Sequence, residues 1–252
     1  MQQQARAQTL AALHAKGNPL VLYNAWDAGS AQAIARTGAK VVATSSWAMA
    51  AAQGYEDGES IPFALVATLI ERIAQTVTLP LSVDVEGGYS EDPAACAENV
   101  GRLLDLGVVG INLEDRVVGG AGLHDTARQS ERIAAIRRMA DARGIALFIN
   151  ARTDVFFGSG IAPQDALGEA LARAAAYAEA GASGLFVPGL VDLEQIGALC
   201  AATPLPVNVM VSPGLPELPA LAAAGVARVS HGPGPYLQAM EALRGHAGAA
   251  FA

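Results

Sequence analysis

The sequence predicts an α/β fold of the (β/α)8 TIM-barrel class. Short apolar runs alternate with helical patterns eight times along 252 residues, about one strand for every 30 residues, as is typical of parallel strands wrapped by outer helices. Several of these runs also end in carboxylates, and parallel folds build their sites where strands end. We therefore expect one barrel domain over residues 1–252.

A doubly wound open sheet is the alternative architecture. Its dinucleotide-binding version places Gly-x-Gly-x-x-Gly directly after the first strand. Residues 24–29 instead read Asn-Ala-Trp-Asp-Ala-Gly. The sequence therefore lacks this fingerprint, and the barrel remains the favoured fold.

The predicted strands are apolar runs short enough to be buried on both faces of a parallel sheet. Each is separated from the next by a helical pattern and by turn residues. The strands are expected at residues 19–23, 41–44, 81–86, about 108–114, 146–150, 184–187, 206–211 and 226–230.

Capping residues and prolines place the helices between these strands. Gly38 and Gly107 suit helix C-termini, whereas Pro62 and Pro93 suit first turns. The small residues after Trp47 are expected to form a connecting segment. Helices are predicted at 1–17 (closing the bottom of the barrel), up to about 38, 60–79, 92–107, around 132–138, about 163–180, 192–201, 216–224 and after Pro235.

Composition and charge exclude several classes of partner. The formal net charge is −8 and the pI is near 5.0, so a basic face for nucleic acid or an anionic membrane is not expected. Cys96 and Cys200 lie in Ala-rich helical patterns and are expected to be buried and unpaired. No apolar run suits a membrane span, and the N-terminus lacks a signal-peptide core. We expect a cytoplasmic protein.

Carboxylates end two consecutive predicted strands. Asp84 and Glu86 close the third strand, and Glu114 closes the fourth. If they converge, they offer oxygen ligands to a hard divalent ion, most plausibly Mg2+. The alternative is that these residues are solvated loop starts or helix N-caps.

Other polar and aromatic residues follow the strands and would share the same rim. Arg152, after the fifth strand, faces the acids and suits the grip of a small carboxylate. Its alternative role is a structural ion pair with a rim acid. The further candidates are Tyr23, Ser45, Ser46, Trp47, Asn208 and His231.

Several enzyme classes conflict with the residues present. A Schiff-base aldolase needs a rim lysine, and the chain has only Lys16 and Lys40, of which Lys40 precedes a strand. The four histidines are too few near the rim for a zinc hydrolase of the barrel type. No Gly-x-Ser-x-Gly elbow occurs, although counting cannot exclude a Ser–His–acid triad.

The ordered motifs of residues 18–190 resemble the isocitrate lyase/phosphoenolpyruvate mutase superfamily. Any one of them alone is a weak signal, but the set in this order is specific. The motifs are Asn24-Ala-Trp-Asp-Ala-Gly-Ser-Ala, Thr44-Ser-Ser-Trp, Gly54-Tyr-Glu-Asp-Gly, Ser82-Val-Asp-Val-Glu-Gly-Gly-Tyr, Ile111-Asn-Leu-Glu-Asp and Asn150-Ala-Arg-Thr-Asp.

This resemblance implies a ligand set for the metal and an assembly. It implies Mg2+, with Mn2+ as a substitute, held directly by Asp84, while Glu86, Glu114 and Asp57 act through water. It also implies a last helix exchanged between subunits of a homotetramer or dimer.

The resemblance further implies how a substrate is held. In similar enzymes, backbone amides at positions matching Ser46 and Trp47, with the hydroxyl at Ser45, hold the oxygens of a pyruvoyl-like acid. Arg152 falls where the family's substrate-binding arginine lies, while Tyr23 and Asn208 would shape the pocket. An enolate that develops at this place would be stabilised by such donors.

The expected mobile active-site loop, 116–130, departs from the lyase branch. That branch carries a catalytic Cys where this chain has Gly122, and residues 116–130 contain no Cys or Lys. His124 alone matches; it is a substitute acid, a carboxylate ligand or a solvated loop residue. His231 is a second candidate proton donor.

Three functions follow as hypotheses. The favoured one is a Mg2+-dependent lyase that cleaves or decarboxylates a small 2-oxo or 2-hydroxy dicarboxylate through an enolpyruvate-type intermediate. The second is a C–P bond enzyme of the phosphonopyruvate hydrolase or phosphoenolpyruvate mutase type. The third is a metal-binding barrel without catalysis. In the first two, the partner is a small carboxylate, not nucleic acid or membrane.

Overall fold

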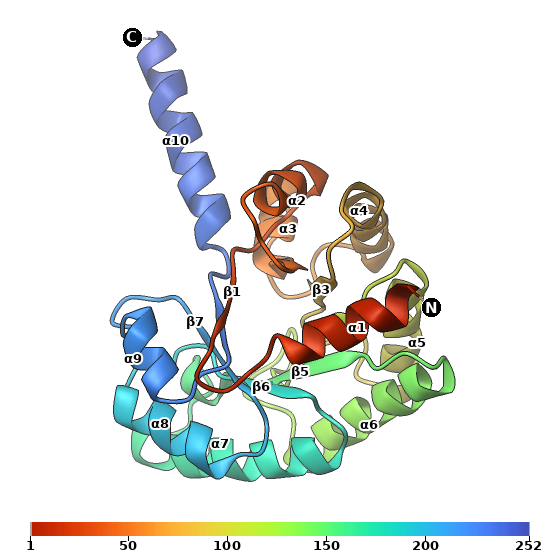
Figure 1. Ribbon diagram of the computed structural model, residues 1–252, viewed down its shortest axis with the longest axis vertical. Coiled ribbons are helices and arrows are strands. Elements are labelled where there is room, and N and C mark those ends of the chain that lie inside the picture. The colour runs from red at the N-terminus through yellow and green to blue at the C-terminus, as the bar shows by residue number, and fades with distance from the viewer. Residues whose placement is uncertain (1, 252) are drawn as a thin grey trace.

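The fold is an eight-stranded parallel barrel, as the computed structural model describes it for residues 2–251. Helices ring the strands in Figure 1. The strands are β1 (Leu20–Leu22), β2 (Val42–Ala43), β3 (Leu81–Asp84), β4 (Gly110–Glu114), β5 (Phe148–Arg152), β6 (Gly184–Phe186), β7 (Val207–Met210) and β8 (Arg228–Ser230). The helices are α1 (Gln2–Ala12), α2 (Ala28–Ala35), α3 (Ser46–Ala52), α4 (Phe63–Thr76), α5 (Pro93–Asp105), α6 (Thr126–Ala142), the short η1 (Asp154–Phe156), α7 (Pro163–Glu179), α8 (Leu193–Ala202), α9 (Leu218–Ala223) and α10 (Gly234–Phe251).

The strands follow the order β1-β8-β7-β6-β5-β4-β3-β2, and every pair is parallel. A single bridge between Ala25 and Thr44 joins the two ends of this sheet. There the Ala25 N–H donates to the Ala43 carbonyl at 2.8 Å, and the Ser45 N–H donates to the Ala25 carbonyl at 3.0 Å. The predicted barrel class is confirmed, and the C-terminal strand ends share one rim.

The expected order of elements is confirmed, although several strand bounds differ by one or two residues, Glu86 lies beyond the end of β3, and α1 ends at Ala12. The small residues after Trp47, expected to form a connecting segment, belong with Ser46 and Trp47 to α3, because the Ser45 side chain caps this helix by accepting from the Ala48 N–H. The loop expected over 116–130 ends earlier, because Asp125 caps α6 and residues 126–130 are helical.

The N-terminal end of the barrel, where the strands begin, is covered by α1, which crosses in front of the strands in Figure 1. Ala7 and Leu10 of α1 pack into a cluster with the starts of β1, β4 and β5. Most other buried side chains are Ala, Val, Leu and Ile between the sheet and the outer helices. This packing fixes the strands whose far ends carry the polar residues.

The last helix, α10, projects away from the barrel (Figure 1). Its side chains Leu237, Leu243 and Phe251 are 49%, 59% and 90% exposed. Within residues 2–251, no helix is both long and apolar enough to cross a membrane.

His14 follows α1 and is buried at the bottom of the barrel, with 9% of its surface exposed. Its Nδ1 donates to the Leu10 carbonyl at 2.8 Å, and its ring stacks on Phe148 with centroids 3.9 Å apart. Burial, together with the charge of Arg228, lowers the pKa of His14 to about 3. The folded protein therefore keeps this imidazole neutral well below pH 6.

We expect His14 to make the fold acid-sensitive. The unfolded chain gains a proton on this residue below about pH 6.5, whereas the folded chain does not, so stability falls as the pH drops toward 3. Urea unfolding at pH 8 and pH 5 should show that the wild type loses about 2 kcal/mol more than His14→Phe between these values. An equal loss in both proteins would contradict this account of His14.

Candidate active site

A cavity of about 110 Å³ opens at the C-terminal ends of the strands. Its wall combines carboxylates, one arginine and large apolar side chains. Its lining includes Asp57, Asp84, Glu86, Glu114, Arg152 and Trp47. A space this small suits an acid of a few carbon atoms rather than a large cofactor.

Asp84 ends β3 and is held by the strand-2 side of the rim. Its N–H donates to the Thr44 hydroxyl at 3.0 Å. Its Oδ2 accepts from the Ser46 hydroxyl at 2.8 Å and from the Ser46 N–H at 3.3 Å. Its Oδ1 is buried and has no hydrogen-bond partner among residues 2–251. A buried carboxylate oxygen without a donor is costly, so this atom is suited to a cation or a water.

Glu86 lies in a backbone turn that interlocks with the loop carrying Asp57. Glu86, Glu59 and Tyr89 all have left-handed φ, of 51°, 56° and 58°. The Glu59 N–H donates to Glu86 Oε2 at 2.6 Å, and the Tyr89 N–H donates to Glu59 Oε1 at 2.7 Å. Non-glycine residues persist in this conformation only where their surroundings enforce it. The interlock therefore fixes the direction of the Glu86 carboxylate.

The remaining oxygen of Glu86, Oε1, is buried and lacks a hydrogen-bond partner within the described part of the chain. Burial raises the pKa of Glu86 to about 8; the Glu59 N–H lowers it, and the charges of Asp84 and Asp57 raise it further. The cavity thus holds two unpartnered carboxylate oxygens, one on Asp84 and one on Glu86.

Glu114 and Arg152 face each other across the β4–β5 ladder, where they are paired residues. Arg152 Nη1 lies 2.9 Å from Glu114 Oε2, and Nε and Nη2 donate to the Asp154 carboxylate at 2.6 and 2.8 Å. Burial raises the pKa of Glu114 to about 8, although the Arg152 charge opposes this shift. The two carboxylates fix the guanidinium, and a planar fork of this kind keeps further N–H groups for an anion.

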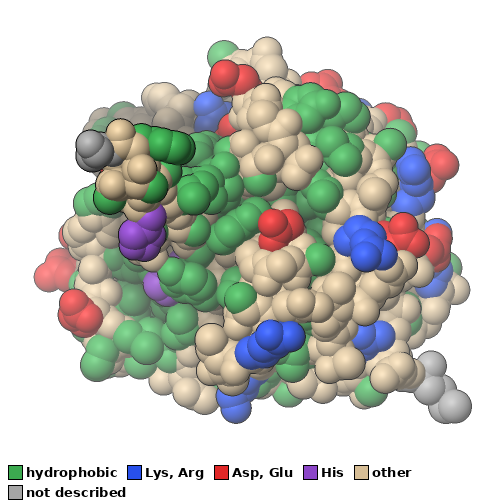
Figure 2. Space-filling model, turned by 90° about the horizontal axis from the view of Figure 1, so that it is seen from above, with side chains coloured by type: hydrophobic (Ala, Val, Ile, Leu, Met, Phe, Trp, Pro, Cys, Tyr) green, Lys and Arg blue, Asp and Glu red, His purple; other side chains and the backbone are tan. Residues whose placement is uncertain are grey.

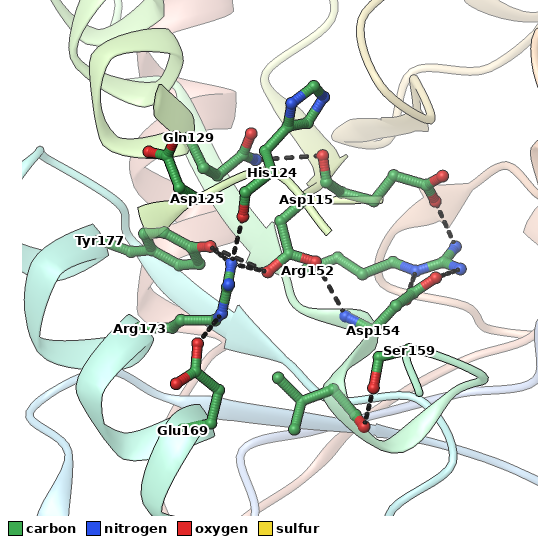
Figure 3. Close-up of polar contacts among 12 residues, drawn as sticks. Asp115, His124, Asp125, Gln129, Arg152, Asp154, Ser159, Glu169, Arg173 and Tyr177 are labelled. Carbon is green, nitrogen blue, oxygen red and sulfur yellow. Dashed lines mark hydrogen bonds and ion pairs between the residues drawn. The ribbon is translucent and has the colours of Figure 1, made fainter. Parts of the chain in front are cut away.

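Asp115 organises the support behind Arg152, as Figure 3 shows. Its carboxylate accepts from the Asp154 N–H at 3.0 Å, from Arg173 Nη1 at 3.0 Å and from the Tyr177 hydroxyl at 2.8 Å. Arg173 also donates to the His124 carbonyl at 2.9 Å. The His124 N–H in turn donates to the Asp115 carbonyl at 2.7 Å.

These contacts fix both ends of the loop between Asp115 and His124. Gly119 and Gly122 within it have positive φ, and an added Cβ at either would meet open space. The loop therefore has anchored ends and a glycine-rich middle, and its movement as an active-site lid stays a prediction.

The structure brings most of the predicted site residues together. The residues that line the cavity are Asp57, Asp84, Glu86, Glu114, Arg152, Ser45, Ser46 and Trp47. Convergence from four strand ends follows from barrel geometry, because successive parallel strands end at the same rim.

Four predicted residues lie outside the cavity wall. The Tyr23 hydroxyl donates to Gln238 Oε1 at 2.6 Å, and its ring lies 5.0 Å from the His231 ring. Asn208 is buried within the barrel and accepts from the Ser230 hydroxyl at 3.3 Å. His124 lies in a separate hollow with Glu59 and Arg132.

Sequence reasoning missed three contributors. Thr44 orients Asp84, Glu59 orients Glu86, and Phe157 forms part of the apolar wall. Thr44 stands in the quoted Thr44-Ser-Ser-Trp motif, so its position at a strand end was a usable signal. No pattern in the sequence marks Glu59 or Phe157.

Among residues 2–251, no three His, Cys, Asp or Glu side chains form a ready-made metal cage. The free oxygens of Asp84 and Glu86 nevertheless fit an ion that keeps part of its water shell. Mg2+ binds in this way, through one or two carboxylates and several waters. The donor set is all oxygen, which suits Mg2+ or Mn2+ better than zinc or copper.

A family model, phosphoenolpyruvate phosphomutase, matches residues 10–251. An uncharacterised protein of Mycobacterium tuberculosis is 35% identical over 224 residues, covering 89% of this chain and 81% of the relative. An oxaloacetate decarboxylase of Bradyrhizobium is 32% identical over 180 residues. The matched region covers 68% of this chain and 58% of that enzyme.

Solved structures share the fold. A Burkholderia cenocepacia protein, provisionally named a phosphonomutase, is 48% identical with a TM-score of 0.92, covering 96% of this chain and 97% of that one. A phosphonopyruvate hydrolase solved with oxalate and Mg2+ has a TM-score of 0.82 at 22% identity, covering 95% and 84% of the two chains. At 22% identity, this likeness shows a shared fold and nothing more.

Proposed function

This chain belongs to the phosphoenolpyruvate phosphomutase family, and we propose that it is a Mg2+-dependent lyase for a small 2-oxo or 2-hydroxy dicarboxylate. The reaction would break a C–C bond, or release CO2, through an enolpyruvate-type intermediate. The observation that carries the proposal is the pair of buried, unpartnered oxygens of Asp84 and Glu86 in one cavity with Arg152.

The metal would be held directly by Asp84, with Glu86, Glu114 and Asp57 acting through water. Mn2+ would substitute for Mg2+, because both are hard ions that favour oxygen ligands. When bound, such an ion supplies positive charge that polarises the 2-oxo group of a substrate.

The chain's own groups would hold the organic acid. Arg152 offers the N–H groups left free by Asp154 and Glu114 to a substrate carboxylate. The amides of Ser46 and Trp47, with the Ser45 hydroxyl, would bind the oxygens of the pyruvoyl part. Donors fixed in place before the reaction stabilise negative charge as it develops there.

Decarboxylation suits this chain better than release of a larger product. The loop carries no Cys or Lys to protonate a leaving group, and CO2 needs no such proton. His124 and His231 remain the predicted donors for protonation of the enolate. Neither ring lines the cavity in this arrangement, so either role requires the loop or the rim to move.

A C–P bond enzyme is the second candidate, favoured by the provisional name of the 48% identical Burkholderia protein. A phosphonate group carries more charge than a carboxylate, and it would call for additional cations around the cavity. Among the described residues of the wall, Arg152 is the one cationic side chain, which favours the lyase. A barrel that binds metal without catalysis is the third candidate.

We expect pyruvate without phosphate from a panel of 2-oxo and 2-hydroxy acids supplied with Mg2+. The panel contains oxaloacetate, 2,3-dimethylmalate, 2-methylisocitrate, phosphonopyruvate and isocitrate, and glyoxylate is measured for isocitrate because its cleavage gives no pyruvate. Asp84→Ala should abolish the activity because it removes the direct ligand, whereas Asp105→Ala, on the exposed face of α5, should retain it. Release of phosphate from phosphonopyruvate would instead indicate a C–P bond enzyme. Metal binding without turnover of any acid would favour the non-catalytic barrel.

The assembly that we propose is a homotetramer, or a dimer, formed by exchange of α10. The helix leaves its own barrel, and Figure 2 shows hydrophobic side chains gathered on the left of the face toward which α10 points. Val21, on the outer face of β1, is also 44% exposed. Exposed apolar surface of this kind is typical of an interface.

Charges on α10 should separate the subunits. Leu237→Glu combined with Leu243→Glu places two carboxylates on the apolar surface of the helix, and light scattering should then give the monomer mass. Glu241→Gln, on the same helix, should leave the oligomer intact. A monomeric wild-type protein would contradict the proposed exchange.

A further inference from the structure

Arg228 lies one layer below the floor of the cavity, at the start of β8. Its side chain is completely buried, with 0% exposed. Its Nε donates to the Ser230 hydroxyl at 3.1 Å, and its Nη2 donates to Asn112 Oδ1 at 3.2 Å. Both Ser230 and Asn112 line the cavity. The guanidinium therefore touches the floor without reaching the cavity itself.

This guanidinium forms no ion pair with a carboxylate of the described residues. Its hydrogen-bond partners are neutral, and its Nη1 is buried without a partner. Within the described residues 2–251, it forms no ion pair, in contrast to Arg152 and Arg173. Burial lowers the pKa of Arg228 to about 10, which still leaves it charged at neutral pH.

A buried charge of this kind is unfavourable for folding. Desolvation of an ion that lacks an opposite charge costs free energy, and an apolar residue of similar volume is often at least as stable. The chain nevertheless holds Arg228 against Ser230 and Asn112, which line the cavity. A role in ligand binding at the cavity above it would offset this folding cost.

The charge balance of the cavity identifies such a benefit. Four carboxylates, Asp57, Asp84, Glu86 and Glu114, line the wall, and Arg152 is already paired with Glu114 and with Asp154. An anionic substrate must bind among these carboxyl groups, which are ionised when a divalent cation lies beside them. A fixed positive charge below the floor lowers the electrostatic cost of that entry, and it acts over a short distance in a low-dielectric interior.

We propose that Arg228 tunes the cavity for a small carboxylate anion by supplying unneutralised positive charge beneath its floor, at the expense of affinity for the divalent cation. It would act through the electrostatic potential and through Asn112 and Ser230, not by touching the substrate. This inference rests on the proposed function, because it assumes that both a metal ion and an acid bind in this cavity.

The test uses two neutral variants, Arg228→Met and Arg228→Gln, in the full-length protein. Calorimetry would measure the affinity for Mn2+ alone and the affinity for oxalate at saturating Mn2+. We expect Mn2+ to bind about tenfold more tightly and oxalate about tenfold more weakly, the size expected for one nearby charge at an effective dielectric constant of about 20. Arg228→Lys, which keeps the charge, should restore wild-type values.

A structural role would give a different pattern. If Arg228 only supported the fold, both ligands would bind more weakly to the neutral variants, and this outcome would overturn the proposal. The melting temperature provides a further check, because the Met variant should unfold at or above the wild-type temperature. Arg137→Met, which removes an arginine on the outer helix α6, should change neither affinity.

The failure of this inference is distinguishable from failure of the proposed function. If the wild type binds Mn2+ and oxalate but the neutral variants bind both with unchanged affinity, the proposed role of Arg228 is wrong. The proposed metal and acid site is then still supported. If the wild type binds neither probe, the proposed metal and acid site is itself wrong, and the role of Arg228 falls with it.

Discussion

The structure depends on the burial of several carboxylates around one small cavity. Burial raises the pKa values of Glu86 and Glu114 to about 8, and one oxygen each of Asp84 and Glu86 has no hydrogen-bond donor. Like charges in a low-dielectric space repel unless a cation lies among them. Arg152 meets part of this requirement. A hydrated divalent ion would meet the remainder, which is why metal binding is central to our proposal.

The surrounding contacts hold those carboxylates in place. Glu59 fixes Glu86 through a turn of left-handed residues, and Asp115 fixes Asp154, which orients Arg152. Arg173 links the same network to the end of the glycine-rich loop at His124. Support of this kind holds these side chains in position and anchors both ends of the glycine-rich loop.

The sequence was informative where structure follows from periodicity and strand order. Apolar runs predicted the barrel, and the carboxylates after consecutive strands predicted that Asp84, Glu86 and Glu114 lie together, because parallel strands end at one rim. It was less informative about side-chain direction at the other strand ends. Asn208 lies inside the barrel, whereas Tyr23 contacts α10. Successive residues of a strand point to opposite faces, so an error of one residue reverses the predicted direction of a side chain.

Contacts between distant segments were not predictable from local patterns. Glu59 supports Glu86 only because two loops, 27 residues apart in sequence, meet in the fold. Nothing in the apolar run around Arg228 distinguishes it in the sequence. Its complete burial, without an ion-pair partner among the described residues, is visible only in the structure. The helix over residues 46–52 was missed because Ser45 serves as its cap at the end of a strand.

The most direct test of the central claim is a crystal structure of the protein soaked in Mn2+, with anomalous scattering used to locate the ion. Our account predicts one strong peak in the cavity, in direct contact with an Asp84 oxygen, with waters between the ion and Glu86 and Glu114. An empty cavity at millimolar Mn2+, or an ion bound elsewhere in the molecule, would contradict it.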